Sequence, residues 1–184
     1  AAGQHKHPRA HARLRALLVS TAGRAAIDTL LEDQGLLQSI GHRPVLDCVC
    51  GYLRDDDRTV PTDVYSFHVD SATVATDTYL CSYTAPASEG LRNDEARRRV
   101  DIPEVRARLL ARFGGDDGEE FRAWLSENFH DLQYVPVAQA RPFSFGVGNL
   151  WRIAVAWPGC PVPACIHRAP ELLPGQPARL LLIS

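Results

Sequence analysis

The sequence predicts a mainly β protein with flanking helices, and three features lead to this fold class. Apolar and polar residues alternate with a period of two in many short segments, as is typical of strands. Helical periodicity is confined to the N-terminal region and to one central region. The strand-like segments are not each followed by a helix, which argues against a parallel doubly wound sheet. We therefore expect an antiparallel sandwich or a jelly-roll barrel with helices packed outside it.

We expect a single domain over residues 1–184, because this length suffices for one full core. Residues 1–10 are polar and rich in histidine, and we interpret them as a loosely held tail. Residues 11–40 carry leucine and isoleucine at spacings of three and four, which predicts N-terminal helices. Gly23 and Gly35 are expected to divide this region into pieces.

The first group of barrel strands is predicted within residues 43–90. The period changes to two at residues 43–53, and a polar turn separates this segment from residues 64–70. A third strand is expected at residues 76–84, and together the three segments form one half of the predicted barrel.

A helical insertion is predicted within residues 91–130. One helix begins at Pro103, a residue favoured in the first helical turn, and ends at Gly114. A second helix is expected over residues 118–129. Four arginines precede these helices, and such a run is more typical of a solvated helix face than of a site for an acidic substrate. They are Arg92, Arg97, Arg98 and Arg99.

Residues 132–184 return to strand patterns separated by turns rich in glycine and proline, which predicts the second group of barrel strands.

Composition excludes several functional classes. The net charge of −2 argues against a nucleic-acid partner, and no apolar run approaches the length needed to cross a bilayer. The N-terminus has no signal-peptide pattern, and five cysteines lack the spacing of a disulfide scaffold, so we expect a cytoplasmic protein with reduced thiols.

His68 and Asp70 lie two residues apart in the segment "SFHVDS". In a strand, residues i and i+2 share a face, so both side chains leave one face together, while Phe67 and Val69 face the opposite way. The alternative is a polar pair at a strand end. A third ligand is available in His167, in the short apolar segment "ACIH". Two histidines and one carboxylate leave three positions open on a non-heme iron, as in the facial triad of iron(II) oxygenases.

Arg179 follows His167 by twelve positions in an apolar C-terminal strand. A buried arginine needs a partner, and its guanidinium suits bidentate pairing with the carboxylate of a cosubstrate. A structural salt bridge or an outward-facing arginine is the alternative. Arg168, beside His167, points to the other side of its strand.

Further residues around the predicted centre are candidates for supporting roles. Tyr79, Cys81 and Tyr83 share one face of a predicted strand and either pack there or line the pocket, where the tyrosine hydroxyls would bond a cosubstrate carboxylate. Glu89 in the following turn is a candidate for orienting a ligand, and Arg168 is a weaker one.

This ordered set resembles the Fe(II)/2-oxoglutarate-dependent dioxygenases, which are built on a double-stranded β-helix. The segments "FHVDSATVATDTYLCSYTAPASEGL" and "LWRIAVAWPGCPVPACIHRAPELLPGQPARLLLIS" also look like an uncharacterised bacterial family, a domain of unknown function. The resemblance covers roughly residues 64–91 and 149–184. It implies a jelly-roll fold and Fe(II) held by His68, Asp70 and His167, with zinc or nickel able to substitute. It further implies 2-oxoglutarate as a cosubstrate bound by Arg179, and a small-molecule or peptide substrate.

The sequence also allows alternative interpretations of the site and of the function. Cys48, Cys50, Cys160 and Cys165 offer thiolates for a zinc site, although their spacing is not that of zinc knuckles. Cys165 and His167 would share a strand face as a nucleophile pair, but no third orienting residue is evident. At the level of function, the alternatives are a non-catalytic β-barrel that binds a metal or small ligand and an interaction protein whose barrel supports the helices.

Overall fold

A computed structural model of the chain describes residues 12–16, 20–55, 59–173 and 175–184. The predicted tail, residues 1–10, lies outside the described residues. Two compact units are distinguished by their internal contacts, the first comprising Ala1–Val45 with Ser184 and the second Leu46–Ile183. The second unit contains the sheets and every predicted site residue.

The first unit is built on helix α2, Thr21–Ser39. The helix begins at Ser20, whose hydroxyl accepts the backbone N–H of Gly23 at 3.0 Å. Gly35 lies inside α2, so the prediction that the two glycines divide the region is wrong. A glycine costs only about 1 kcal/mol relative to alanine within a helix, and the rest of α2 tolerates this.

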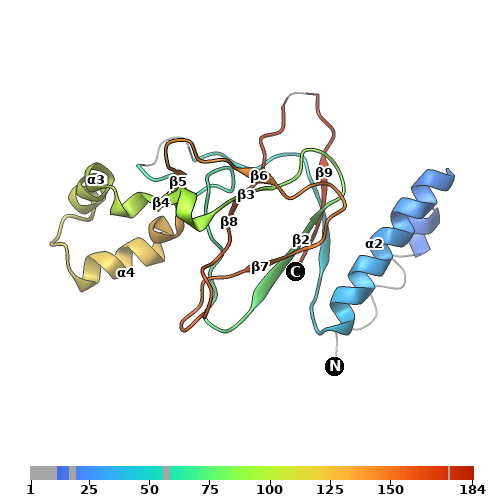
Figure 1. The fold of residues 1–184 in the computed structure, drawn as a ribbon, viewed down its shortest axis with the longest axis horizontal. Helices are drawn as coiled ribbons and strands as arrows, with labels where there is room; N and C mark the ends of the chain where they lie inside the picture. The colour runs from blue at the N-terminus through green and yellow to red at the C-terminus, as the bar shows by residue number, and fades with distance from the viewer. Residues whose placement is uncertain (1–11, 17–19, 56–58, 174) are drawn as a thin grey trace. The chain divides into compact units, whose positions relative to one another are not determined.

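The second unit contains antiparallel sheets with a few helices, which confirms the mainly β prediction (Figure 1). A four-stranded sheet has the order β1-β9-β2-β7, and a three-stranded sheet has the order β6-β3-β8. A third sheet pairs β4 with β5. The first sheet comprises β1 Val45–Val49, β2 Asp77–Ser82, β7 Trp151–Ala154 and β9 Arg179–Ile183. The other strands are β3 Glu89–Leu91, β4 Ala96–Arg98, β5 Tyr134–Pro136, β6 Phe143–Ser144 and β8 Ile166–Arg168.

Strand pairing joins segments that are far apart in the sequence. Strand β2 is antiparallel to both β7 and β9, and β3 is antiparallel to both β6 and β8. The C-terminal strands therefore lie next to strands from the first half of the chain. A core of apolar side chains connects the four-stranded sheet to Phe145, which follows β6. This core comprises Val49, Leu80, Phe145, Ile153 and Leu181.

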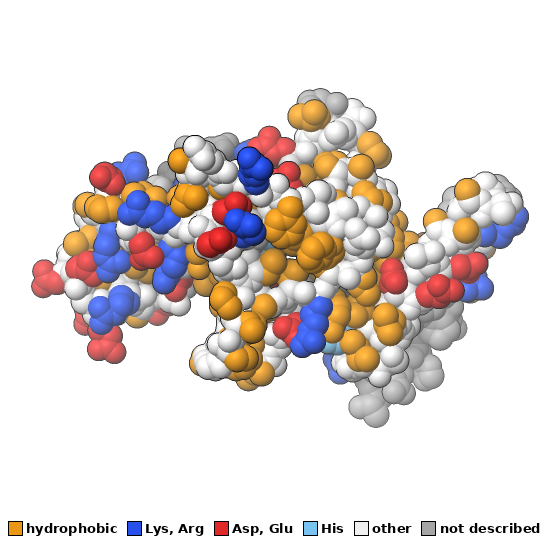
Figure 2. Space-filling view, viewed as in Figure 1, with side chains coloured by type: hydrophobic (Ala, Val, Ile, Leu, Met, Phe, Trp, Pro, Cys, Tyr) orange, Lys and Arg blue, Asp and Glu red, His pale blue; other side chains and the backbone are white. Residues whose placement is uncertain are grey.

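The central helices form a smaller core of their own. Helix α3, Pro103–Phe113, begins at the predicted proline and ends at Gly114, which has the left-handed conformation that glycine favours (φ 78°). Helix α4, Glu119–Glu127, packs Phe121 and Leu125 into the same core. Acidic and basic side chains are interspersed on the surface around these two helices (Figure 2).

The region predicted as a helical insertion is only partly helical. Before α3 it contains β4 and two short 3₁₀ helices, η1 Asn93–Glu95 and η2 Arg99–Asp101; a third, η3 His130–Leu132, follows α4. The arginine run therefore does not lie along the face of one helix, contrary to the expectation from the sequence: Arg97 and Arg98 lie in β4, which pairs with β5, and Arg99 begins the 3₁₀ helix η2. None of the helices in the described part of the chain is long and apolar enough to cross a membrane.

Candidate metal centre

The segment that carries His68 has extended backbone held from both sides, although it forms only isolated bridges and no regular strand. On one side, His68 and His167 each donate their backbone N–H to the carbonyl of the other at 2.9 Å. On the other side, His68 lies opposite Gln133. The prediction of a strand over residues 64–70 is wrong in its first half, where the Asp63 carboxylate accepts the backbone N–H groups of Tyr65 and Ser66 and forms a turn.

The alternation predicted for this segment is confirmed. Phe67 and Val69 are buried in a core with Leu91 and Ile166. His68 therefore leaves the opposite face, which it shares with its cross-strand partner His167 because directly opposite residues point to the same side of a sheet.

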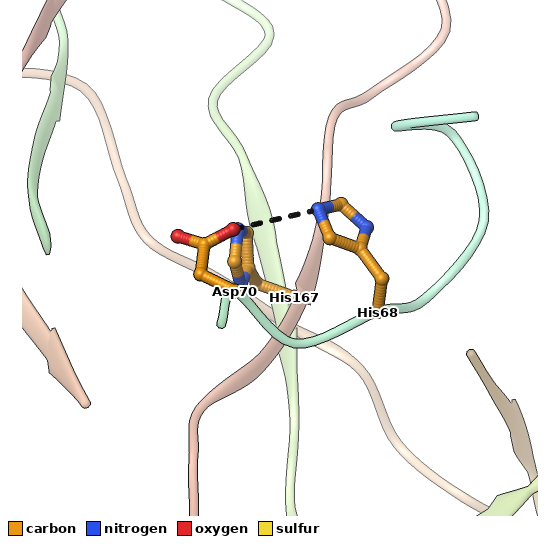
Figure 3. Close-up of side chains that lie close together, drawn as sticks. All are labelled: His68, Asp70 and His167. Atoms are coloured by element: carbon orange, nitrogen blue, oxygen red, sulfur yellow. Dashed lines mark ion pairs between the residues drawn. The ribbon is translucent and has the colours of Figure 1, made fainter. Parts of the chain in front are cut away.

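His68, Asp70 and His167 converge within the described part of the chain (Figure 3). One ligand atom from each of the three lies within 4.8 Å of the others. The Nε2 atoms of His68 and His167 lie 4.0 and 3.9 Å from Asp70 Oδ1, and the imidazole centroids are 4.6 Å apart. Three donor atoms at these separations surround a common point at which a divalent metal ion can bind.

Neighbouring polar groups orient all three donors. His68 Nδ1 lies 2.8 Å from the Ser66 carbonyl, and His167 Nδ1 lies 3.1 Å from the Cys165 carbonyl. A carbonyl can only accept, so it fixes the proton on Nδ1 and leaves the lone pair on Nε2 directed at the centre. These two carbonyls were not predicted, although both precede their histidine by two residues.

The Asp70 carboxylate is held in the same manner. The Thr78 hydroxyl donates to Asp70 Oδ2 at 3.1 Å, which leaves Oδ1 for the metal. Thr78 was not predicted, because the sequence does not indicate which face of β2 turns toward Asp70.

Burial of the His68 imidazole lowers its pKa, and the adjacent His167 lowers it further. Asp70 and the backbone carbonyl of Ser66 oppose this shift. The neutral imidazole, which is the form that binds a metal, is therefore favoured.

The face of β2 that turns toward the centre is not the predicted one. Thr78 contacts Asp70, and Ser82 contacts Arg179. Because side chains alternate along a strand, Tyr79 and Cys81 belong to the other face of β2, and Cys81 is fully buried. Tyr83 follows the end of the strand, and its backbone N–H donates to the Leu180 carbonyl at 2.8 Å.

Glu89 and Arg168 contact each other and not a metal ligand. They are direct cross-strand partners in β3 and β8, and Arg168 Nε donates to Glu89 Oε2 at 2.8 Å. The Arg168 guanidinium also lies over the ring of Phe67, 4.4 Å from its centroid. Arg168 follows His167 and points to the opposite face, as predicted. The contacts of Glu89 and Arg168 pair these two residues with each other and do not orient a metal ligand.

Arg179 is 1% exposed and projects from the inner face of β9, the face that also buries Leu181. Its Nη2 donates to the Ser88 hydroxyl at 2.9 Å and its Nε to the Pro86 carbonyl at 3.2 Å. Its Nη1 is enclosed and has no hydrogen-bond partner among the described residues. Burial lowers the pKa of the guanidinium. Arg179 is thus a buried cation with one donor group that has no hydrogen-bond partner among the described residues.

The cysteine alternatives receive no geometric support. Within the described chain, His68, Asp70 and His167 form the only group of three candidate metal ligands, and Cys48 and Cys50 are exposed. Burial raises the pKa of the Cys165 thiol to about 11, so at neutral pH it is protonated and a poor nucleophile.

Comparison with known proteins gives no relative. The chain matches no protein-family model, no curated protein and no solved structure.

Proposed function

We propose that this protein is a mononuclear non-heme iron(II) oxygenase that uses 2-oxoglutarate as its cosubstrate. The observation that carries the proposal is the convergence of His68, Asp70 and His167 on one point, with Nε2 of each imidazole freed by a hydrogen bond at Nδ1. The resemblance to the Fe(II)/2-oxoglutarate dioxygenases and the paired antiparallel sheets support a jelly-roll arrangement around this centre.

The donor set fits iron(II). Two neutral imidazoles and one carboxylate would hold the ion and neutralise part of its charge. The bound ion would supply coordination positions for a chelating cosubstrate and for dioxygen. Zinc and nickel bind the same donors, so the metal found after purification does not by itself identify the native one.

Arg179 fits the far carboxylate of the cosubstrate. Thr78, which contacts Asp70, and Ser82, which contacts Arg179, lie four residues apart on β2. This separation is roughly 13 Å along the strand. The side chains of Asp70 and Arg179 lie within this interval, and in this proposal 2-oxoglutarate would span it with its free carboxylate at the unpaired Nη1.

In this proposal iron and 2-oxoglutarate together supply the oxidation of a C–H bond by dioxygen. The protein supplies geometry and a dry environment. The backbone carbonyls of Ser66 and Cys165 keep the imidazoles oriented, and the Thr78 hydroxyl prevents rotation of the Asp70 carboxylate. Phe145, which is 2% exposed and stacks on the His167 ring, excludes water from that side.

Anaerobic reconstitution with Fe(II) tests the ligand set. We expect one iron per chain in the wild-type protein and none in Asp70→Ala. Asp94→Ala serves as the matched control, because Asp94 is an exposed carboxylate that lies outside the predicted centre, and it should retain one iron. Equal iron content in the wild type and Asp70→Ala would refute the assignment.

Addition of 2-oxoglutarate to the iron-loaded protein tests the cosubstrate. We expect a weak visible charge-transfer band and slow formation of succinate in air, both lost in Arg179→Met. Arg168→Met is the matched control, since Arg168 contacts Glu89 on the opposite face. Iron binding without the band or succinate would identify a metal-binding protein that does not use 2-oxoglutarate.

A further inference from the structure

The candidate ligands belong to a longer row of residues that lie opposite one another in five adjacent segments of the chain. His167 lies opposite both His68 and Gly90, and His68 also lies opposite Gln133. The β4–β5 register pairs Arg98 with Tyr134, and it continues by one residue through a 2.9 Å hydrogen bond from Arg99 N–H to the Gln133 carbonyl. Directly opposite residues share a face, so Gln133 lies on the side of the metal ligands. Arg99, the first residue of η2, is its neighbour through this backbone hydrogen bond.

Gln133 is the member of the row next to His68. The two form a pair without mutual backbone hydrogen bonds, because the flanking bonds run from Tyr134 N–H to the Phe67 carbonyl and from Val69 N–H to the Leu132 carbonyl. In pairs of this type the side chains approach each other most closely. Gln133 thus extends the metal-ligand row by one polar residue.

The Gln133 side chain has an acceptor to spare. It is 3% exposed, and its Nε2 donates to the Phe129 carbonyl, which fixes the orientation of the amide. Its Oε1 is enclosed and has no hydrogen-bond partner among the described residues. An unmade hydrogen bond on a buried amide is costly, so this oxygen is suited to accept an N–H from a ligand.

Arg99 supplies a complementary donor one position further along the row. Its Nε is enclosed and likewise has no partner within the described part of the chain. Asp63 is the acidic residue that acts on Arg99 electrostatically, but its carboxylate oxygens already accept backbone N–H groups of Asp55, Tyr65 and Ser66. The guanidinium therefore retains a free donor and a charge that suit an external carboxylate.

The opposite end of the row is apolar. A Cβ at Gly90 would lie 2.4 Å from the ring of Phe143 and 2.7 Å from that of Phe145, so both rings cover the backbone there. Phe145 also stacks on Trp151, with ring centroids 4.7 Å apart. The row thus runs from aromatic rings, past the metal ligands, to an acceptor and then a cation.

We propose that Gln133 and Arg99 form the substrate-recognition subsite of this centre and that the substrate carries an N-acylated α-amino acid group. The amide N–H of that group is a donor for Gln133 Oε1, its carboxylate pairs with Arg99, and its acyl chain points to the metal. The inference deepens the proposed function and rests on it.

The spacing of the row agrees with this chemistry. Adjacent segments of a sheet lie about 5 Å apart, so Gln133 is one spacing beyond His68 and Arg99 roughly 10 Å beyond it. The same N–H and carboxylate occur in a free N-acyl amino acid and at a peptide C-terminus, and the experiment below separates these two sources.

Calorimetric titration of the zinc-loaded full chain with N-butyrylglycine tests the subsite, because zinc prevents turnover. We expect binding that weakens at least tenfold in Gln133→Leu and in Arg99→Gln. Arg97→Gln is the matched control: Arg97 is exposed, lies two residues from Arg99 and contacts the Asp101 carbonyl, so this variant should bind as the wild type does.

Analogues test the same contacts on the wild-type protein, whether or not the variants fold. Butyryloxyacetate lacks the N–H, and N-butyrylglycine methyl ester lacks the carboxylate; each should bind at least tenfold more weakly than N-butyrylglycine. If a tetrapeptide with a free C-terminal carboxylate binds more tightly than N-butyrylglycine, the substrate is a peptide C-terminus. If N-butyrylglycine binds more tightly, the substrate is a small molecule.

The outcomes separate this inference from the proposed function. The protein could fail to bind zinc or iron and yet, without metal, bind N-butyrylglycine in a manner that depends on Gln133 and Arg99. This result would refute the proposed oxygenase function and support the proposed subsite. Binding of metal and 2-oxoglutarate, with no N-butyrylglycine binding or with equal affinity for the three compounds, would overturn the subsite alone.

Discussion

His68 and His167 lie directly opposite each other, and each donates its backbone N–H to the carbonyl of the other at 2.9 Å. The two imidazoles are therefore brought together by main-chain hydrogen bonds that do not depend on a bound ion. Asp70 follows two residues after His68 and is oriented by Thr78 from a neighbouring strand. The three donors are preorganised, so little ordering of the chain opposes metal binding.

Metal binding is expected to stabilise the native state. An ion present at a hundredfold excess over its dissociation constant adds about 2.7 kcal/mol to the free energy of unfolding. For a chain of this length, each kcal/mol raises the midpoint by about 2–4 °C. We expect the melting temperature, measured by circular dichroism, to rise with Fe(II) or Zn(II) and to fall on chelation. His167→Ala should show no such rise, whereas His42→Ala, altered in the first unit, should retain it.

Gly90→Ala is expected to destabilise the protein and weaken metal binding together. The added Cβ would lie 2.4 Å from the Phe143 ring and 2.7 Å from the Phe145 ring. Phe143 is 37% exposed and can move, but Phe145 is buried between Trp151 and His167. Overpacking of this kind costs about 1–3 kcal/mol.

Urea unfolding and Zn(II) titration measure the two effects. Gly35→Ala is the control: nothing lies within 4 Å of its Cβ, and alanine favours the helix, so stability should be unchanged or higher. If Gly90→Ala unfolds at the same urea concentration as the wild type and binds Zn(II) with the same affinity, the rings of Phe143 and Phe145 move aside without cost.

The sequence predicted those parts of the fold that depend on local periodicity. Pro103 and Gly114 mark the observed ends of α3, since a proline start and a left-handed glycine end are decided within one turn. The alternation of Phe67 and Val69 against His68 was equally local. The convergence of His68 and His167 is not local, since it depends on pairing between segments about a hundred residues apart. It was expected only because the order of the candidate residues resembles that of a known family.

The residues that support the candidate site were mostly not predictable. Alternation predicts that Thr78 and Tyr79 lie on opposite faces of β2. It does not predict which face contacts Asp70, because that depends on the strands that neighbour β2 in the sheet. Gln133 joins the row only through its pairing with His68, a contact between isolated segments that no sequence pattern marks. The arginine run was assigned to a helix face because its pairing with β5 was not visible.

Thiol labelling is expected to distinguish the cysteines by burial and pKa. With its pKa near 11, about one Cys165 thiol in a thousand is ionised at pH 8. Cys48 and Cys50 are exposed, and Cys81 is fully buried. Mass spectrometry after iodoacetamide treatment at pH 8 should show early modification of Cys48 and Cys50 and slow modification of Cys165 and Cys81. Preferential labelling of Cys165 would instead favour a nucleophilic Cys165–His167 pair.

Thr78→Val should weaken metal binding without unfolding the protein. Valine matches the shape of threonine but removes the hydroxyl that donates to Asp70 Oδ2 at 3.1 Å, so the carboxylate gains freedom to rotate. Loss of such a supporting hydrogen bond typically lowers metal affinity about 10- to 100-fold. Competition with a chromophoric chelator measures the affinity for Zn(II). The control is Thr76→Val, because Thr76 is exposed and, among the described residues, its hydroxyl donates only to the Asp77 carbonyl, at 3.4 Å. If both variants bind Zn(II) as tightly as the wild type does, Thr78 does not orient a metal ligand, and the carboxylate is held by other contacts.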